Sequence, residues 1–151
     1  MPSNLYGPGD NFNPLNSHVP AALVDRFHEA KINNFEKVKV WGSGKPLREF
    51  LYVEDLANAC IFLAENYSSE EPINVGTGKE ISIKDFAQLI KKIVGFRGKI
   101  IFDKTKPDGV HKKVLNTEKV NKLGWKPETS LESGLRKYYK WYLENIEDIR
   151  R

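Results

Sequence analysis

The chain has 151 residues, of which 40% are hydrophobic, with a formal net charge of +4 and a single cysteine, Cys60. This length can bury a core without disulfides, so we expect one domain over residues 1–151, with Cys60 as a small core residue in a reducing, cytoplasmic setting. No apolar run approaches the roughly 20 residues that cross a bilayer, and the basic residues are scattered, so we expect no membrane and no nucleic-acid partner. An anionic small molecule fits the modest positive charge.

Residues 1–17 are rich in proline, glycine, asparagine and aspartate, which predicts a loop with successive turns. A helix should follow from His18 to about Lys31, with Ser17 as its N-cap and Pro20 in its first turn. Imidazole exchanges protons near neutral pH, so His18 is a candidate for proton transfer, although a lone histidine is more often structural.

Residues 38–59 combine a strand, a glycine turn, an arginine and a helix start. The alternation around Val38 and Val40, followed by glycines 42 and 44 and a second alternating run over residues 48–53, predicts a β-hairpin. Its two limbs would bring Trp41 and Arg48 close to one turn. A guanidinium matches phosphate oxygens and an indole offers a flat face for a sugar or base. The alternative is a core tryptophan and an arginine in a surface ion pair.

Helices and strands continue to alternate after this segment, which indicates the α/β class. We expect Cys60 on the buried face of a helix that ends near Glu65. Further elements are a strand over residues 72–78, a helix from Ser82 to Gly95, a strand over 99–103, a short helix over 118–123 and a last helix capped by Ser130.

Two glycine motifs do not support phosphate binding. The Gly76-x-Gly78 pair lacks the third glycine of a dinucleotide loop, and the residues before Gly44-Lys45 do not complete a phosphate-binding loop of the Walker type. The polar turn at Asp108 could bind sugar hydroxyls, or it could be an ordinary turn.

Several motifs together resemble a known family. They are Asn4-Leu5-Tyr6-Gly7-Pro8, Asn16-Ser17-His18, Val40-Trp41-Gly42-Ser43-Gly44, Arg48-Glu49-Phe50, Ile73-Asn74-Val75-Gly76-Thr77-Gly78 and Lys106-Pro107-Asp108-Gly109. Their order is similar to that in the C-terminal half of the GDP-L-fucose synthases, which are extended short-chain dehydrogenase/reductases. The resemblance covers essentially the whole chain.

The resemblance implies a fold, a reaction and a set of site residues. The fold would be the substrate-binding C-terminal portion of such an enzyme, α/β with short strands alternating with helices. The reaction would convert GDP-4-keto-6-deoxy-D-mannose to GDP-L-fucose by 3,5-epimerisation and NADPH-dependent 4-reduction. His18 would be the acid in epimerisation, with no metal. NADP(H) would contact Pro2, Ser3, Asn4, Leu5 and His18, and the GDP-sugar would contact Arg26, Trp41, Arg48 and Asp108.

This sequence departs from complete family members, because the Gly-rich NADP loop, the Ser/Tyr/Lys triad and the cysteine base of the Rossmann half are absent. We therefore expect this chain alone to be inactive and to bind no NADP(H), with residues 1–17 bordering a Rossmann half that a separately encoded chain could supply. Two alternatives stay open: half of another nucleotide-sugar epimerase or reductase, and a non-enzymatic nucleotide-sugar-binding or assembly module. The sequence leaves the oligomeric state open.

Overall fold

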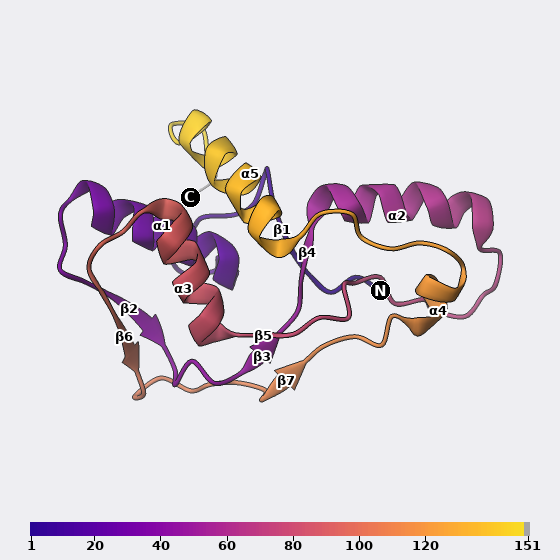
Figure 1. The fold of residues 1–151 in the computed structure, drawn as a ribbon, viewed down its shortest axis with the longest axis horizontal. Coiled ribbons are helices and arrows are strands. Elements are labelled where there is room, and N and C mark those ends of the chain that lie inside the picture. The colour runs from indigo at the N-terminus through magenta and orange to yellow at the C-terminus, as the bar shows by residue number, and fades with distance from the viewer. Residues whose placement is uncertain (150–151) are drawn as a thin grey trace.

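Short strands and helices alternate along residues 1–149, the part of the chain that the computed structural model describes. Figure 1 shows α1, α3 and α5 with β2 and β6 at one end of an elongated molecule, and α2 and α4 at the other. The helices are α1 (Val19–Ile32), α2 (Val53–Asn66), α3 (Ile83–Val94), α4 (Glu118–Lys122) and α5 (Leu131–Glu144). The strands are β1 (Asn4–Tyr6), β2 (Lys37–Trp41), β3 (Leu47–Arg48), β4 (Phe50–Tyr52), β5 (Ile81–Ser82), β6 (Lys99–Asp103) and β7 (Lys112–Lys113).

The larger of two apolar clusters joins α1, α3 and α5. The α3 helix follows its sequence signals: the Ser82 side chain accepts a hydrogen bond from the Asp85 N–H at 3.0 Å, and Gly95 ends the helix in the left-handed region with φ 78°. The α5 helix begins at the predicted cap, where the Ser130 side chain accepts a hydrogen bond from the Ser133 N–H, and one of its faces is buried, with Tyr138 and Tyr142 both fully inside. These two helices confirm the sequence interpretation.

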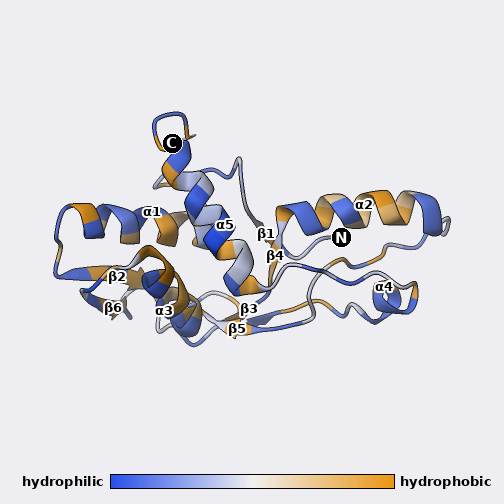
Figure 2. Cartoon of the chain, turned by 45° about the horizontal axis from the view of Figure 1, so that its top comes forward, coloured by the Kyte–Doolittle hydropathy of each residue, from blue (hydrophilic) through white to orange (hydrophobic). Residues whose placement is uncertain are grey.

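The smaller cluster lies under α2, and it corrects the prediction for Cys60. Only Asp55 and Ala59 are buried in α2, and Cys60 is exposed. Because one residue turns a helix by about 100°, Cys60 leaves the face on which Ala59 packs. Figure 2 shows that α2 nevertheless carries many hydrophobic residues. No helix within residues 1–149 is long and apolar enough to cross a membrane.

The predicted hairpin is wrong, because its two limbs join different sheets. Strand β2 pairs in parallel with β6, so that Val40 lies opposite Phe102, whereas β3 lies between β5 and β7. Strand β4 pairs in parallel with β1. The turn at Gly42 and Gly44 has positive φ at both glycines and leads the chain from one sheet into another instead of folding it back.

The first 17 residues contain a strand, β1, that loop composition did not reveal. The strand predicted over residues 72–78 is reduced to one parallel bridge between Val75 and Pro2. In that bridge the Ser3 N–H donates to the Val75 carbonyl at 3.0 Å. Both segments thus find their backbone partners far away in the sequence, which periodicity alone cannot show.

Candidate functional site

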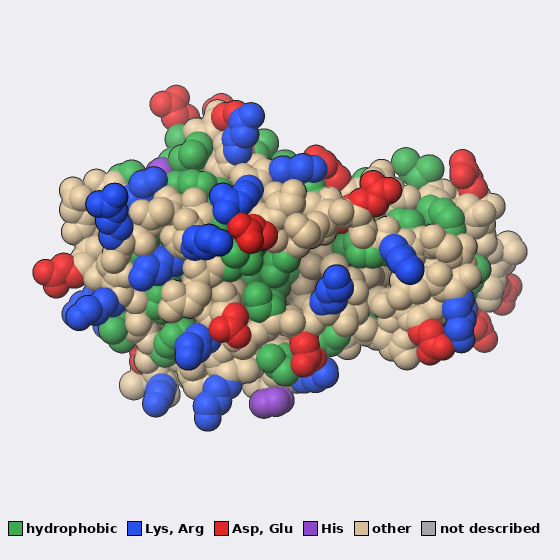
Figure 3. Space-filling model, viewed as in Figure 1, with side chains coloured by type: hydrophobic (Ala, Val, Ile, Leu, Met, Phe, Trp, Pro, Cys, Tyr) green, Lys and Arg blue, Asp and Glu red, His purple; other side chains and the backbone are tan. Residues whose placement is uncertain are grey.

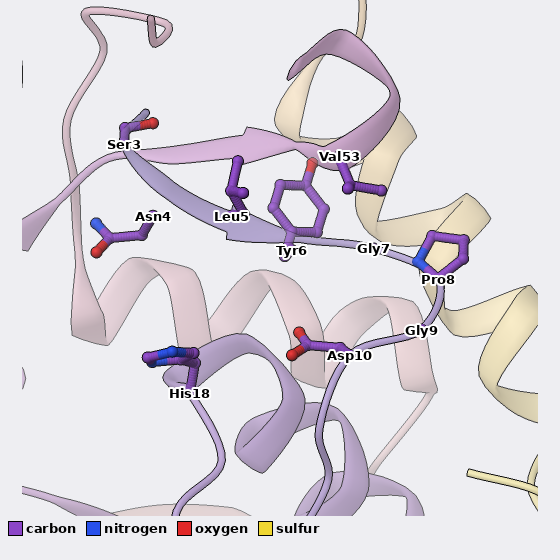
Figure 4. A pocket seen from close by; sticks show the side chains of 10 residues that line it. All are labelled: Ser3, Asn4, Leu5, Tyr6, Gly7, Pro8, Gly9, Asp10, His18 and Val53. Atoms are coloured by element: carbon purple, nitrogen blue, oxygen red, sulfur yellow. The ribbon is translucent and has the colours of Figure 1, made fainter. Parts of the chain in front are cut away.

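A cavity of about 430 Å³ opens beside β1 and the loop that follows it. Figure 4 shows its lining, in which the Asp10 carboxylate extends toward the side where the His18 ring lies. The lining residues are Ser3, Asn4, Leu5, Tyr6, Gly7, Pro8, Gly9, Asp10, His18 and Val53. The cavity lining therefore contains four of the five residues predicted to contact a cofactor, and one of these, His18, is also the predicted proton-transfer residue.

The loop after β1 passes very close to α2, and glycine makes this possible. Gly7 has φ +149°, and a Cβ there would come 2.4 Å from the Val53 Cγ1. Such a contact is far below van der Waals separation, so a larger residue would push the loop away from β4 and α2. This close approach forms one wall of the cavity.

His18 is itself the N-cap of α1, one residue later than predicted for Ser17. Its side chain makes no capping hydrogen bond, and Pro20 lies in the first turn as predicted. Because His18 is exposed and is not used to cap the helix, its ring is available to a ligand in the cavity.

Ser3, Asn4 and Leu5 line the cavity, whereas Pro2 contributes to the bridge with Val75. The Asn4 amide nitrogen donates to the Glu49 carbonyl at 2.7 Å, which fixes the orientation of the Asn4 side chain. Within residues 1–149, Ser3 Oγ is a buried oxygen that has no hydrogen-bond partner. A buried hydroxyl without a partner is costly, and a ligand that reaches it would remove this cost.

A second group of predicted residues surrounds Trp41. The Arg26 guanidinium carbon lies 5.3 Å from the centre of the Trp41 ring, and Lys106 Nζ lies 5.6 Å from it. The indole is nevertheless 59% exposed, so it is not the core tryptophan of the alternative interpretation. Lys106 was not among the predicted site residues. Its position two residues before Asp108, in the same turn, was the one sequence feature that could have indicated a role at this site.

Asp108 links the turn in which it lies to the turn that contains Ser43. Its carboxylate accepts hydrogen bonds from the Ser43 N–H at 2.5 Å and from the Ser43 hydroxyl at 2.7 Å. These two bonds hold the pKa of Asp108 below its usual range. Asp108 thus ties the loop to the end of β2, next to Trp41.

Arg48 lies on β3 beyond the same turn. One of its guanidinium nitrogens donates to the Leu47 carbonyl at 2.7 Å. A Cβ on Gly109 would lie 3.7 Å from the other end of the guanidinium, so Arg48 faces the turn that carries Asp108. In the described part of the chain Arg48 forms no salt bridge, contrary to the surface ion pair considered as an alternative.

Two buried carboxylates organise these loops, and sequence analysis missed both. Glu49 is 0% exposed and accepts hydrogen bonds from the backbone N–H groups of Thr77, Gly78 and Leu115. Asp55 is 3% exposed and accepts from the N–H and the hydroxyl of Thr129, each at 3.1 Å. An acidic residue inside a segment of large apolar side chains was the signal that could have identified Glu49.

Comparison with known proteins gives the same relatives in sequence and in structure. The profile of the NAD dependent epimerase/dehydratase family matches residues 1–76. The chain is 58% identical to putative GDP-L-fucose synthase 2 of Arabidopsis thaliana, in an alignment that covers 97% of this chain and 44% of the relative. It is 56% identical to probable GDP-L-fucose synthase 1 of Oryza sativa subsp. japonica, in an alignment that covers 100% of this chain and 46% of the relative. The crystal structure of a GDP-L-fucose synthetase from Naegleria fowleri bound to NADP superposes with a TM-score of 0.94 at 39% identity, over 99% of this chain and 47% of that one.

The chain spans about half the length of the curated relatives it matches. Its fold is that of the C-terminal part of these extended short-chain dehydrogenase/reductases, as the sequence predicted.

Proposed function

Because the chain belongs to the NAD dependent epimerase/dehydratase family, we propose that it is the substrate-binding half of a GDP-L-fucose synthase. The observation that carries this proposal is the exposed Trp41 ring at the end of β2 with two cations near it, one of which, Arg26, lies on the helix that begins at the His18 cavity. Arg26 is eight residues after His18, which on an α-helix is a rise of about 12 Å. We propose that a nucleotide at Trp41 places its sugar in the cavity that His18 lines.

The nucleotide end is supported by the charges around Trp41. An exposed indole offers its face to a base or ribose, while Arg26 and Lys106 supply positive charge beside it. Arg48, which has no carboxylate partner in residues 1–149, can turn its planar fork to phosphate oxygens. We propose that Asp108 acts on the same ligand mainly by holding the turn in place.

The sugar end is supported by the chemistry that His18 can perform. A proton on the carbon beside a ketone is acidic when the carbonyl is polarised, and epimerisation requires that the ring carbon be reprotonated from the opposite face. We propose that His18 holds and delivers that proton at the hexose carbons, in GDP-4-keto-6-deoxy-D-mannose as substrate. Its exposed ring at the mouth of the cavity suits this role.

The residues beside β1 fit the nicotinamide end of NADP(H). The buried Ser3 hydroxyl without a partner and the oriented Asn4 amide offer polar groups to the carboxamide of that ring, and Leu5 offers an apolar surface. NADPH, when bound, supplies the hydride for reduction of the ketone. We propose that turnover requires the part of the relatives that this chain does not match, so that the chain alone binds substrate without converting it.

Calorimetric titration of the purified chain with GDP and with GDP-mannose tests this proposal, with UDP-glucose as the competing nucleotide. We expect both GDP ligands to bind more tightly than UDP-glucose, and Arg48→Ala to weaken both about tenfold, since a charge-assisted contact is lost. Arg97→Ala is the control, because Arg97 is an exposed arginine that lies outside the site. Equal affinity for UDP-glucose, or an unchanged affinity in Arg48→Ala, would contradict the proposed function.

A further inference from the structure

We propose that Asp10 binds a hydroxyl group of the hexose ring and so helps to select the sugar that enters the His18 cavity. The proposal rests on the proposed function and deepens it, because it assigns a sugar-recognising group in the cavity that His18 lines. Within residues 1–149, Asp10 is the only carboxylate in the cavity lining, and no lysine or arginine of this part of the chain lines it. Figure 4 shows the Asp10 side chain extending from the loop after β1 into the space beside His18.

The Asp10 carboxylate is held in place from two directions. One oxygen accepts a hydrogen bond from the Asn11 N–H at 2.8 Å, and the other accepts from the Tyr138 hydroxyl at 3.1 Å. An ionised carboxylate offers about four acceptor positions, so two remain for a ligand. A side chain fixed in this way can accept a ligand hydrogen bond without losing rotamer freedom.

Tyr138 is well suited to hold Asp10. It is fully buried in α5, with ring centres 6.0 Å from Tyr6 and 5.8 Å from Phe12. Burial, and next the nearby Asp10 charge, raise the pKa of Tyr138, so its hydroxyl stays a donor over the working pH range. The bond therefore joins the cavity to the core, 128 residues away in sequence.

The chemistry of the cavity selects the class of group that Asp10 can bind. A phosphate beside an ionised carboxylate would be repelled, and among the described lining residues only His18 could carry a positive charge to offset this repulsion. Within residues 1–149 no group of three or more histidine, cysteine or acidic side chains could hold a metal ion. A sugar hydroxyl donates to a carboxylate without a charge conflict, and such charge-assisted bonds are among the stronger ones.

The experiment compares the affinities of GDP and GDP-mannose for the wild type, Asp10→Asn and Asp148→Asn. The wild type should bind GDP-mannose more tightly than GDP, and Asp10→Asn should reduce this ratio about tenfold while leaving GDP unchanged, since a hydrogen bond to a charged group is lost. Asp148→Asn, an exposed aspartate near the chain end, should behave as the wild type. Tyr138→Phe keeps the buried ring and should give an intermediate reduction.

The affinity for GDP alone distinguishes a failure of the Asp10 assignment from a failure of the proposed function. If GDP binds but the mannosyl group adds no affinity, or Asp10→Asn weakens GDP equally, the assignment of Asp10 is overturned and the proposed function stands. If GDP does not bind, the proposed function fails, and NMR titration with methyl mannoside then decides the role of Asp10. Shifts of the Asp10 and Asn11 amide signals that vanish in Asp10→Asn support the assignment, and their absence overturns it.

Discussion

Glu49→Gln should destabilise the protein strongly, although it changes only one oxygen to an amide group. The Glu49 carboxylate is 0% exposed and accepts backbone hydrogen bonds from Thr77 at 2.5 Å, Gly78 at 2.9 Å and Leu115 at 2.7 Å. The Thr77 and Gly78 bonds go to one oxygen and the Leu115 bond goes to the other. In glutamine one end cannot accept, so at least one buried N–H faces another donor.

The magnitude follows from these contacts. Losing one charge-assisted bond costs about 1.5–3 kcal/mol, and the unsatisfied donor adds about 1–3 kcal/mol, so we expect a loss of about 3 kcal/mol. For a chain of this size the melting temperature should fall by about 6–12 °C. Urea unfolding followed by circular dichroism measures the loss, with Glu147→Gln, an exposed residue, as the matched control. A loss below about 1 kcal/mol for Glu49→Gln would refute the inference that Glu49 ties these loops together.

Three further predictions use other contacts. Ser43→Ala should raise the pKa of Asp108 toward its ordinary value, because both hydrogen bonds that lower this pKa come from Ser43 and the substitution removes the hydroxyl; NMR titration of Asp108 measures the shift. In the wild type, the stabilisation that Asp108 provides should be lost as the pH falls through its lowered pKa. Gly134→Ala should destabilise α5 by about 1–3 kcal/mol despite better helix propensity, because the new methyl group would overlap the Tyr6 hydroxyl; a rise in melting temperature would contradict this. Cys60 is exposed, so it should react with a thiol reagent in the folded protein nearly as fast as in the urea-unfolded protein. A much slower reaction in the folded protein would mean that Cys60 is buried, as the sequence analysis expected.

The helices could be predicted because their signals are local. The caps at Ser82 and Ser130 and the left-handed Gly95 each act within a few residues, and the structure confirms them. The sheet pairings could not be predicted in this way. Strand β2 looks like the first limb of a hairpin, yet its partner β6 lies about 60 residues further on, and no periodicity encodes that choice.

The same distinction between local signals and long-range contacts applies to the residues of the candidate site. Residue type and the family resemblance predict Trp41 and His18 as site residues, and the structure shows that both side chains are exposed. They did not identify Glu49 or Asp10, because Thr77, a partner of Glu49, lies 28 residues away and Tyr138, a partner of Asp10, lies 128 residues away. A carboxylate acquires its role from the donors that surround it, and those donors are known only once the chain has folded.

Three carboxylates explain how short strands can still form a defined site. Glu49 fixes the loop at Thr77, Asp55 fixes the loop at Thr129, and Asp10 is fixed by Tyr138. The strands of two or three residues, such as β3 and β4, make few ladder bonds of their own. Glu49 is next to Arg48 in sequence, Asp10 lines the cavity, and Asp55 is two residues after the lining residue Val53, so these long-range bonds hold segments that carry side chains of the candidate site. Substitutions at the three carboxylates should therefore alter ligand affinity as well as stability, whereas cavities made at core positions that contact none of the three should alter stability alone.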